Sequence, residues 1–314
     1  MSGWVQFGPI TVIEGSGGAR FPFCNSLLIG GDPPVLIDPG AGPAVLVPLA
    51  ATVGVVLNTH YHFDHISGNH LFPRARLLIN EVEAGDFRTR SGLAARLGIT
   101  AADGPEGAGR WLDAVRQPGE RPPAPTPHAR HEWWLSTGRV DGTYPYGREF
   151  GLGATAVVMV HTPGHTAGFC CPYFPREGLV YAGDYDLTSF GPWYAGADGD
   201  PAAMEASARR LAELDATHFV TGHQEGVLSR AEFLARLEDY LSVIRRRDER
   251  YLALVREGRD FAAIVAAGVL YPARYHNDPW VAMWERLTAA KHLARLKAAG
   301  EEIPPIPPRL ASPQ

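Results

Sequence analysis

The chain has 314 residues, 45% of them hydrophobic and 20% charged, which is enough apolar material for a packed core and excludes a largely disordered chain. Its formal net charge of −5 gives no overall attraction to nucleic acid or anionic lipid, so we expect neither as a partner. No apolar run is long enough to span a bilayer, no signal-peptide pattern opens the chain, and three cysteines fit a reducing compartment, so we expect a cytoplasmic protein.

Short apolar runs bounded by turn residues dominate up to about residue 225 and predict β-strands. Two of them, 24–30 and 34–40, flank the turn Gly-Asp-Pro and are expected to form a hairpin. Further strands are expected at 53–60, 75–80, 154–165, 169–174, 179–184 and 217–223. A helical pattern at 200–214 has Asp200 as its cap and Pro201 at its first position. This mixture predicts an α/β or α+β domain.

Two regions depart from this rhythm. Residues of about 85–150 contain a proline-rich stretch and are expected to be a surface insertion, whose His128 and His131 face solvent. From residue 229 the pattern becomes helical, and arginines 245–247 are expected on the outer side of the first helix. A later helix has an apolar face that must be covered by the rest of the chain or by a second copy, which would make a homo-oligomer; its residues are Trp280, Met283, Trp284 and Leu287.

The segment THYHFDH, residues 59–65, holds four side chains that can bind a metal ion directly after a predicted strand. In an extended segment alternate residues share a face, so His60 and His62 can bind one ion together. Asp64 and His65, where the chain turns, can point at a second ion nearby. One short segment therefore begins two metal sites.

Three later turns supply the remaining candidates: His165 follows a Pro-Gly turn, and Asp184 and His223 each follow a glycine at a strand end. Strand ends that meet at one sheet edge are where such layers build their sites. We therefore predict one ion on His60, His62 and His165, a second ion on Asp64, His65 and His223, and Asp184 as a bridge. An open position on each ion indicates a catalytic site, and Zn is preferred to Fe or Mn as its metal.

The segments HYHFDH, HTPGHTAG, AGD and TGH, in this order, closely resemble the metallo-β-lactamase superfamily, which includes glyoxalase II-like and lactonase-like hydrolases. The resemblance covers about residues 8–226. It implies an αββα sandwich, a dinuclear site at one sheet edge and the seven ligands named above. In VLIDPG, where the family carries a structural aspartate, it implies that role for Asp38.

The helical C-terminal segment resembles the small winged-helix-like tail of the lactamase-β-2-like branch. We therefore expect a metallo-β-lactamase domain over 1–228, interrupted by the insertion, and a small C-terminal helical domain over 229–314.

The chain also departs from the family. Glyoxalase II proteins carry basic and aromatic residues that grip glutathione after the bridging aspartate, whereas YDLTSFGPWYAG, residues 185–196, has no Lys or Arg. A glutathione thioester is therefore disfavoured. Lactonases have a tyrosine where this chain has Leu187. The candidates for a substrate pocket are Tyr185, Phe190, Trp193 and Tyr194, with Trp133 and Trp134 of the insertion.

The combined features predict a hydrolase in which a hydroxide held by two metal ions attacks a small ester, thioester, lactone or lactam. Asp64 is the expected catalytic residue, because it can hold the nucleophile or take its proton. One alternative is a phosphodiesterase or ribonuclease of the lactamase-β-2-like type, against which the net charge counts. Another is an iron-dependent enzyme of sulfur or oxygen redox chemistry, against which the complete seven-ligand set counts.

Overall fold

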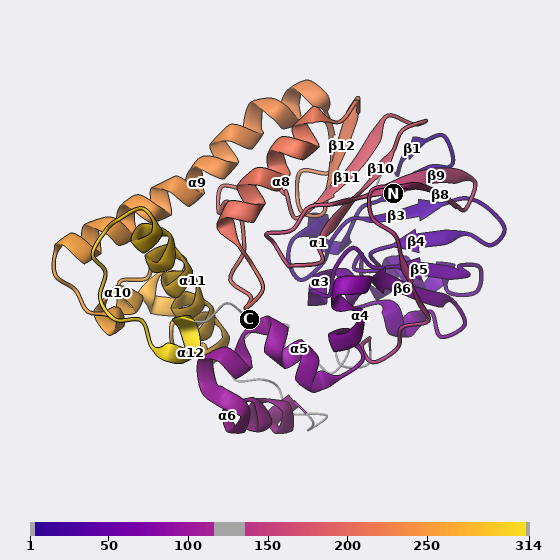
Figure 1. Ribbon diagram of the computed structural model, residues 1–314. Coiled ribbons are helices and arrows are strands. Elements are labelled where there is room, and N and C mark those ends of the chain that lie inside the picture. Colours follow the sequence, from indigo (N-terminus) through magenta and orange to yellow (C-terminus); the bar gives the residue numbers. More distant parts are fainter. Residues whose placement is uncertain (1–3, 116–135, 312–314) are drawn as a thin grey trace.

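The computed structural model describes residues 4–115 and 136–311, and it contains two β-sheets packed face to face (Figure 1). The first sheet has its strands in chain order: β1 (Val5–Phe7), β2 (Ile10–Ile13), β3 (Ser26–Ile29), β4 (Val35–Ile37), β5 (Val55–Leu57), β6 (Arg76–Asn80) and β7 (Gly142–Tyr144). Strands β1 to β4 are antiparallel, and β4 to β7 are parallel. The predicted hairpin is confirmed, because Leu27 pairs with Ile37 across β3 and β4.

The second sheet has the order β13-β12-β11-β10-β9-β8. Its strands are β8 (Glu149–Leu152), β9 (Thr155–His161), β10 (Cys170–Phe174), β11 (Leu179–Gly183), β12 (His218–Thr221) and β13 (Val227–Ser229). Strands β11 and β12 run parallel, and the other neighbouring pairs are antiparallel. Each sheet is thus built from one continuous half of the sandwich sequence.

The helices lie outside the sheets and in the C-terminal part (Figure 1). Their bounds are α1 (Ser16–Ala19), α2 (Pro43–Leu46), η1 (Val47–Leu49), α3 (Phe63–Ile66), η2 (Asn69–Leu71), α4 (Glu81–Phe87), α5 (Arg90–Leu97), α6 (Ile99–Val115), α8 (Pro201–Glu213), α9 (Arg230–Arg256), α10 (Phe261–Ala266), η4 (Ala273–Tyr275), α11 (Pro279–Ala298) and α12 (Pro308–Ala311). As predicted, Asp200 caps α8 by accepting from two backbone N–H groups.

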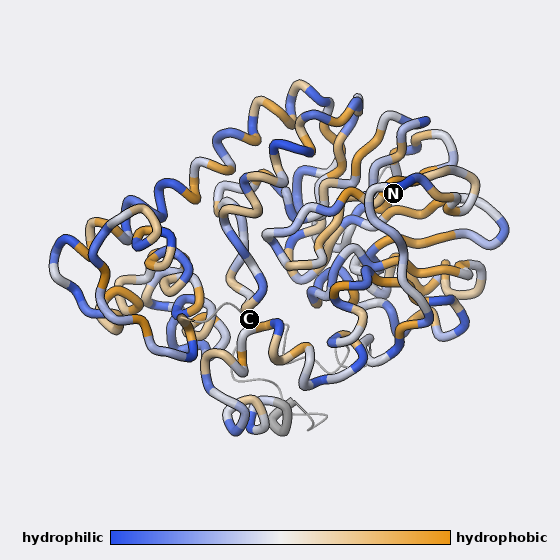
Figure 2. The backbone as a smooth tube through the Cα atoms, in the orientation of Figure 1, coloured by the Kyte–Doolittle hydropathy of each residue, from blue (hydrophilic) through white to orange (hydrophobic). Residues whose placement is uncertain are grey.

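The central strands are apolar along their length because both of their faces are buried. In β4, Val35 and Ile37 face the core between the sheets, whereas Leu36 packs in the outer layer with α2. In β11, Tyr181 enters the same central core and Val180 packs with α8 and α9. Figure 2 shows the hydrophobic residues concentrated along the strands.

Helix α9 connects the sandwich to the C-terminal helices (Figure 1). It begins at a capping box formed by Ser229 and Glu232. Its first half packs on the second sheet through Phe233 and Tyr240, and its second half enters the core of the tail through Tyr251. The expected division after residue 228 therefore falls at the start of a helix that packs on both parts.

Two expectations for this region need correction. Residues 230–311 hold helices and no strand, so the likeness to a winged helix is limited to helices and lacks a wing. Arg245 and Arg246 are exposed as expected, but Arg247 is only 4% exposed. The reason is helical spacing: Arg247 lies three residues after Ile244 and four before Tyr251, on the buried stripe of α9.

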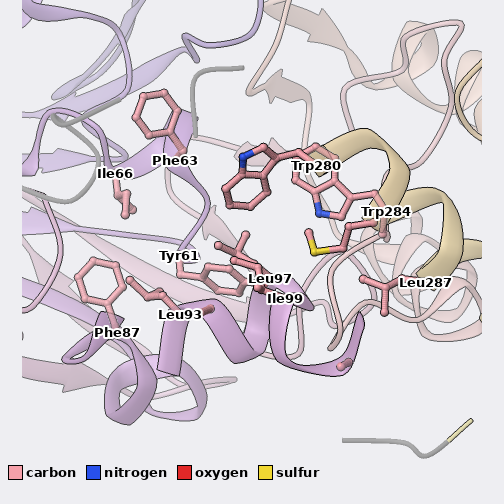
Figure 3. Close-up of a cluster of buried hydrophobic side chains, with 14 of the residues drawn as sticks. Tyr61, Phe63, Ile66, Phe87, Leu93, Leu97, Ile99, Trp280, Trp284 and Leu287 are labelled. Atoms are coloured by element: carbon pink, nitrogen blue, oxygen red, sulfur yellow. The ribbon is translucent and has the colours of Figure 1, made fainter. Parts of the chain in front are cut away.

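The apolar face of α11 is covered within the chain. Trp280, Met283, Trp284 and Leu287 are each at most 5% exposed and pack against residues of α5, α6 and the 61–66 segment. Figure 3 shows Trp280 and Trp284 beside Leu97, and Leu287 on the same face. This face therefore does not need a second copy of the chain. Among the described residues, no helix combines the length and the apolarity that crossing a membrane requires.

Candidate metal centre

Loops that follow strands of both sheets meet at one edge of the sandwich. The loop after β5 leads into α3, and the other loops follow β9, β11 and β12. Each strand ends before its polar residues, which frees their side chains to turn toward a common point. Five of the seven predicted ligands lie in these loops, namely His60, His62, His165, Asp184 and His223, and the other two, Asp64 and His65, lie in α3 itself.

The first cluster consists of His60, His62, His165 and Asp184, whose potential ligand atoms lie within 4.8 Å of one another. His165 Nε2 is 2.6 Å from His62 Nδ1 and 3.2 Å from His60 Nε2. Asp184 Oδ2 lies 2.8 Å from the same His165 nitrogen. Three imidazoles and one carboxylate oxygen therefore surround one small volume.

The second cluster consists of Asp64, His65 and His223, with ligand atoms again within 4.8 Å. Asp64 Oδ2 is 3.1 Å from His223 Nε2. Asp184 reaches this cluster with its other oxygen, Oδ1, which is 2.7 Å from His65 Nε2 and 3.8 Å from His223 Nε2. The two oxygens of Asp184 thus face the two clusters.

Unpaired buried atoms indicate that these residues fit a metal ion. His65 Nε2 and Asp184 Oδ1 are buried and form no hydrogen bond of acceptable geometry within the described chain. These two atoms are only 2.7 Å apart, yet they do not align as a donor and an acceptor. Leaving such groups buried and unpaired is costly, whereas atoms that converge on a cation are satisfied by it.

Asp38 orients one histidine from each cluster. It is fully buried, at a φ of +49°, and its Oδ2 accepts from His65 Nδ1 at 2.7 Å. The same oxygen accepts from the Thr59 hydroxyl, whose oxygen is 3.0 Å from His60 Nδ1. Each of these histidines therefore presents Nε2 to the centre, as in carboxylate–histidine pairs around metals.

Backbone carbonyls orient two further histidines. His165 Nδ1 donates to the carbonyl of Trp193 at 2.8 Å. His223 Nδ1 lies 2.9 Å from the carbonyl of Phe23 and 3.1 Å from that of Ala19. The Nε2 atoms of both rings are consequently left as acceptors for a cation.

The electrostatics favour the metal-binding charge states of His60, His62, Asp64 and Asp184, whereas the pKa values of His65, His165 and His223 are raised despite their burial, so a metal ion has to displace their protons. Burial, and then the neighbouring histidine charges, hold the pKa of His60 and of His62 well below the usual value, so both are neutral. Burial raises the pKa of Asp64, but the hydrogen bond with His223 and the charges of His65 and His223 together outweigh it and bring the pKa to about 2. Burial likewise opposes ionisation of Asp184, and the charges of His165 and His65 still lower its pKa.

A cavity of about 390 Å³ opens over the two clusters. Its walls are mostly apolar and include Phe21, Leu97, Phe190, Trp193, Tyr271 and Trp284. Its acidic lining residues are Asp64, Asp184 and Asp186, and no Lys or Arg is among its described lining residues. The cavity therefore suits an uncharged, partly apolar molecule placed against the metal ligands.

The four predicted pocket residues divide into two pairs. Phe190 and Trp193 line the cavity. Tyr185 and Tyr194 do not: both are fully buried and face away from it, so this part of the prediction is wrong. The hydroxyl of Tyr185 donates to the carbonyl of Met204. The reason is that each tyrosine directly follows a residue that faces the site, and neighbouring residues of an extended chain point to opposite sides.

The remaining predicted residues of the insertion are two tryptophans and two histidines. Trp133, Trp134, His128 and His131 lie outside the described residues.

The sequence did not reveal the contribution of the tail to the cavity. Tyr271, Val281 and Trp284 line it, although they come from the helical segment. Glu285 holds this wall, because its carboxylate accepts from the backbone N–H of Tyr271 at 2.8 Å and of Val269 at 2.8 Å. The only sequence signal was the apolar face of α11, which predicted burial but not the site it would reach.

Comparison with known proteins agrees with this geometry. The family model described as metallo-beta-lactamase superfamily matches residues 19–223. A hydroxyacylglutathione hydrolase from Acidiphilium cryptum is 29% identical over 282 residues, which cover 88% of this chain and 91% of that protein. Another hydroxyacylglutathione hydrolase, from Methylococcus capsulatus, is 28% identical over 225 residues, which cover 71% of this chain and 69% of that protein.

Solved structures share the fold. A metallo-beta-lactamase family protein from Thermus thermophilus aligns with a TM-score of 0.64 at 21% identity, covering 93% of this chain and 94% of that chain. A beta-lactamase domain protein from Burkholderia ambifaria aligns with a TM-score of 0.63 at 16% identity, covering 93% and 87%. At these identities the likeness concerns the fold alone, and it confirms the predicted sandwich with its C-terminal helical region.

Proposed function

This chain belongs to the metallo-β-lactamase superfamily and is a hydrolase, and on this premise we propose that it hydrolyses a small ester, thioester, lactone or lactam with two divalent metal ions, preferably Zn. The first ion would bind to His60, His62 and His165, and the second to Asp64, His65 and His223, with Asp184 between them. The observation that carries the proposal is the convergence of these seven buried side chains from both sheets.

When bound, such ions lower the pKa of a coordinated water from 15.7 toward about 7 and polarise a substrate oxygen. The residues of the chain would supply position and proton handling. Asp64 is ionised and lies at the cavity, where it can accept the proton of the attacking water. Phe190, Trp193 and Trp284 would hold the apolar part of the substrate and keep bulk water away from it.

The cavity supports a substrate whose parts away from the metal ions carry no negative charge. Asp64 and Asp184 would be balanced by the ions they bind, which leaves the carboxylate of Asp186 and, among the described lining residues, no Lys or Arg to pair with an anionic group of the substrate. Within a partly dry cavity, like charges repel more strongly than they do in water. We propose that residues 229–314 act as an appended domain that supplies one wall of this cavity.

Metal analysis is the test of the proposal. Protein purified without chelators is expected to contain close to two transition-metal ions per chain. His62→Ala should lose metal mainly from the first site, because one of its three imidazoles is removed. His70→Ala is a matched control, since His70 bonds to Ser67 and Ser136 outside both clusters. One ion or fewer in the reconstituted wild-type protein would contradict a dinuclear centre.

A second prediction concerns the glutathione thioester, since the curated relatives above are named hydroxyacylglutathione hydrolases. We expect kcat/KM for S-D-lactoylglutathione to be at least about tenfold lower than for the same acyl group on a neutral thiol, a difference of about 1.4 kcal/mol. The reason is that, away from the metal ions, the described lining of the cavity has Asp186 but no Lys or Arg to pair with the glutathione carboxylates. The two thioesters share the acyl group and the scissile bond, so a neutral thiol of similar size isolates the charge of the leaving group. Preference for the glutathione thioester would show this reasoning to be wrong.

A further inference from the structure

Residues 190–196 form a segment between the metal centre and the C-terminal helices. Some of its carbonyl groups bond to the C-terminal helices and one bonds to the metal centre. The carbonyls of Phe190, Pro192, Tyr194 and Gly196 accept hydrogen bonds from two cations of the tail. The carbonyl of Trp193, between them, accepts from His165 Nδ1 at 2.8 Å. The tail therefore fixes the position of this segment through four of its carbonyl groups. A fifth carbonyl, that of Trp193, orients the predicted metal ligand His165.

Arg247 of α9 makes most of the contacts on the tail side. Its Nη1 donates to the carbonyl of Pro192 at 2.6 Å and to the hydroxyl of Tyr194 at 2.9 Å, and its Nη2 donates to the carbonyl of Phe190 at 2.7 Å. The guanidinium also lies 5.1 Å from the centre of the Phe190 ring. Arg247 is 4% exposed and forms no ion pair among the described residues, so these oxygens replace its hydration.

Lys291 of α11 extends the same arrangement. Its Nζ donates to the carbonyl of Tyr194 at 2.9 Å and to that of Gly196. Burial lowers the pKa of Lys291 to about 8. Tyr271, also from the tail, accepts a hydrogen bond from the Trp193 indole at 2.8 Å. The tail thus forms hydrogen bonds to this segment on both sides of Trp193.

Trp193 transmits this position to the first metal cluster. Besides the bond from its carbonyl to His165, its ring lies edge-on to the His62 ring, with centres 5.0 Å apart and planes at 90°. Its ring also packs edge-on to Trp284 of α11 at 5.3 Å. By contrast, the partners of His65 and His223 are Asp38 and backbone carbonyls of the N-terminal segment, none of them from the tail.

We propose that Arg247 and Lys291 are positioning residues of the first metal site: through the carbonyl and ring of Trp193 they fix the orientation of His165 and His62. The inference rests on the proposed ligand assignment. It predicts that loss of either cation from the tail weakens the first site and spares the second. Removing an outer partner of a metal ligand typically costs about 10- to 100-fold in metal affinity.

The test compares Arg247→Met with Arg245→Met, an exposed position two residues earlier on the same helix. Metal affinity of each site is measured by competition with a chromophoric chelator, and the geometry of the first site by the visible spectrum of the cobalt-substituted protein. R247M is expected to bind its first-site ion about 10- to 100-fold more weakly, with an altered cobalt spectrum and a lower kcat at similar KM. R245M should match the wild type, and Arg247→Lys should recover part of the affinity because it keeps a donor.

Lys291→Met carries the same test if R247M does not fold, since Lys291 is only partly buried and its expected effect has the same site selectivity. Two tightly bound ions in R247M or K291M, with the spectrum of R245M, would overturn the inference while leaving the proposed function intact. Equal weakening of both sites would also overturn it, because it would indicate a general loss of stability. A wild-type protein that binds no metal would instead overturn the proposed function on which the inference depends.

Discussion

Asp184→Asn is expected to reduce hydrolysis at least about 10³-fold, more than the roughly 10- to 100-fold cost of losing an outer-shell partner. The two oxygens of Asp184 face the two clusters, at 2.8 Å from His165 and 2.7 Å from His65. An amide keeps the size of the side chain but removes the negative charge and presents an N–H₂ group to one of the sites. We therefore expect both ions to be bound more weakly, which elemental analysis after dialysis and steady-state kinetics would measure.

Asp186→Asn is the matched control for this change. Asp186 is two residues further along the same loop and lines the cavity, but it belongs to neither ligand cluster and accepts instead from the N–H of Thr188. The D186N protein should retain both ions. If D184N kept both ions with wild-type affinity and turnover, the bridging role of Asp184 would have to be abandoned.

Glu83→Gln is expected to change how stability depends on pH. Glu83 is fully buried beneath the His165 loop, where it accepts from the Thr166 hydroxyl at 2.5 Å and from the N–H of Gly168 at 3.2 Å. Burial, with the nearby charge of Asp198, raises its pKa from 4.5 to about 7. The folded state therefore binds this proton more tightly than the unfolded state.

The sign of the effect follows from that difference. The stabilisation is complete below the unfolded pKa of 4.5 and is lost as pH rises through about 7. From pH 5 to pH 8 the free energy of unfolding of the wild type should fall relative to that of E83Q by roughly 2 to 3 kcal/mol. Chemical denaturation at both pH values measures it, and Glu81→Gln, exposed in the same helix, is the control. A constant difference between wild type and E83Q would mean that Glu83 is ionised in the folded state throughout this range.

The positions of the strands and of the predicted ligands could be anticipated from local sequence. His60 and His62 follow an apolar strand and are two residues apart, and His223 follows a glycine at a strand end. The position of each residue after a strand could therefore be predicted, as could the common direction of the His60 and His62 side chains. The clustering of these residues needed only the rule that strand ends meet at a sheet edge.

The cavity walls were harder to anticipate because they depend on packing between distant segments. Trp284 reaches the site only because α11 docks on α5 and α6, a contact that no local pattern encodes (Figure 3). The prediction for Arg247 is wrong because a run of three arginines resembles a solvated face, whereas the helical turn places one of them on the buried stripe. The sequence predicted that the tail contributes no metal ligand, and neither ligand cluster contains a residue of the tail. The contacts between the tail and Trp193 became evident only from the hydrogen bonds to residues 190–196.

The way the two sheets share the ligands has a consequence for assembly of the molecule. Each proposed ion would join side chains from the first sheet's sequence to a histidine from the second, such as His62 to His165, 103 residues apart. Such an ion acts as a cross-link that closes a long loop, and like a disulfide it would restrict the unfolded chain as well as tie the two halves of the sandwich together. During synthesis neither ion could be held by its full set of ligands until the second half had emerged and docked, so metal capture would mark completion of the fold.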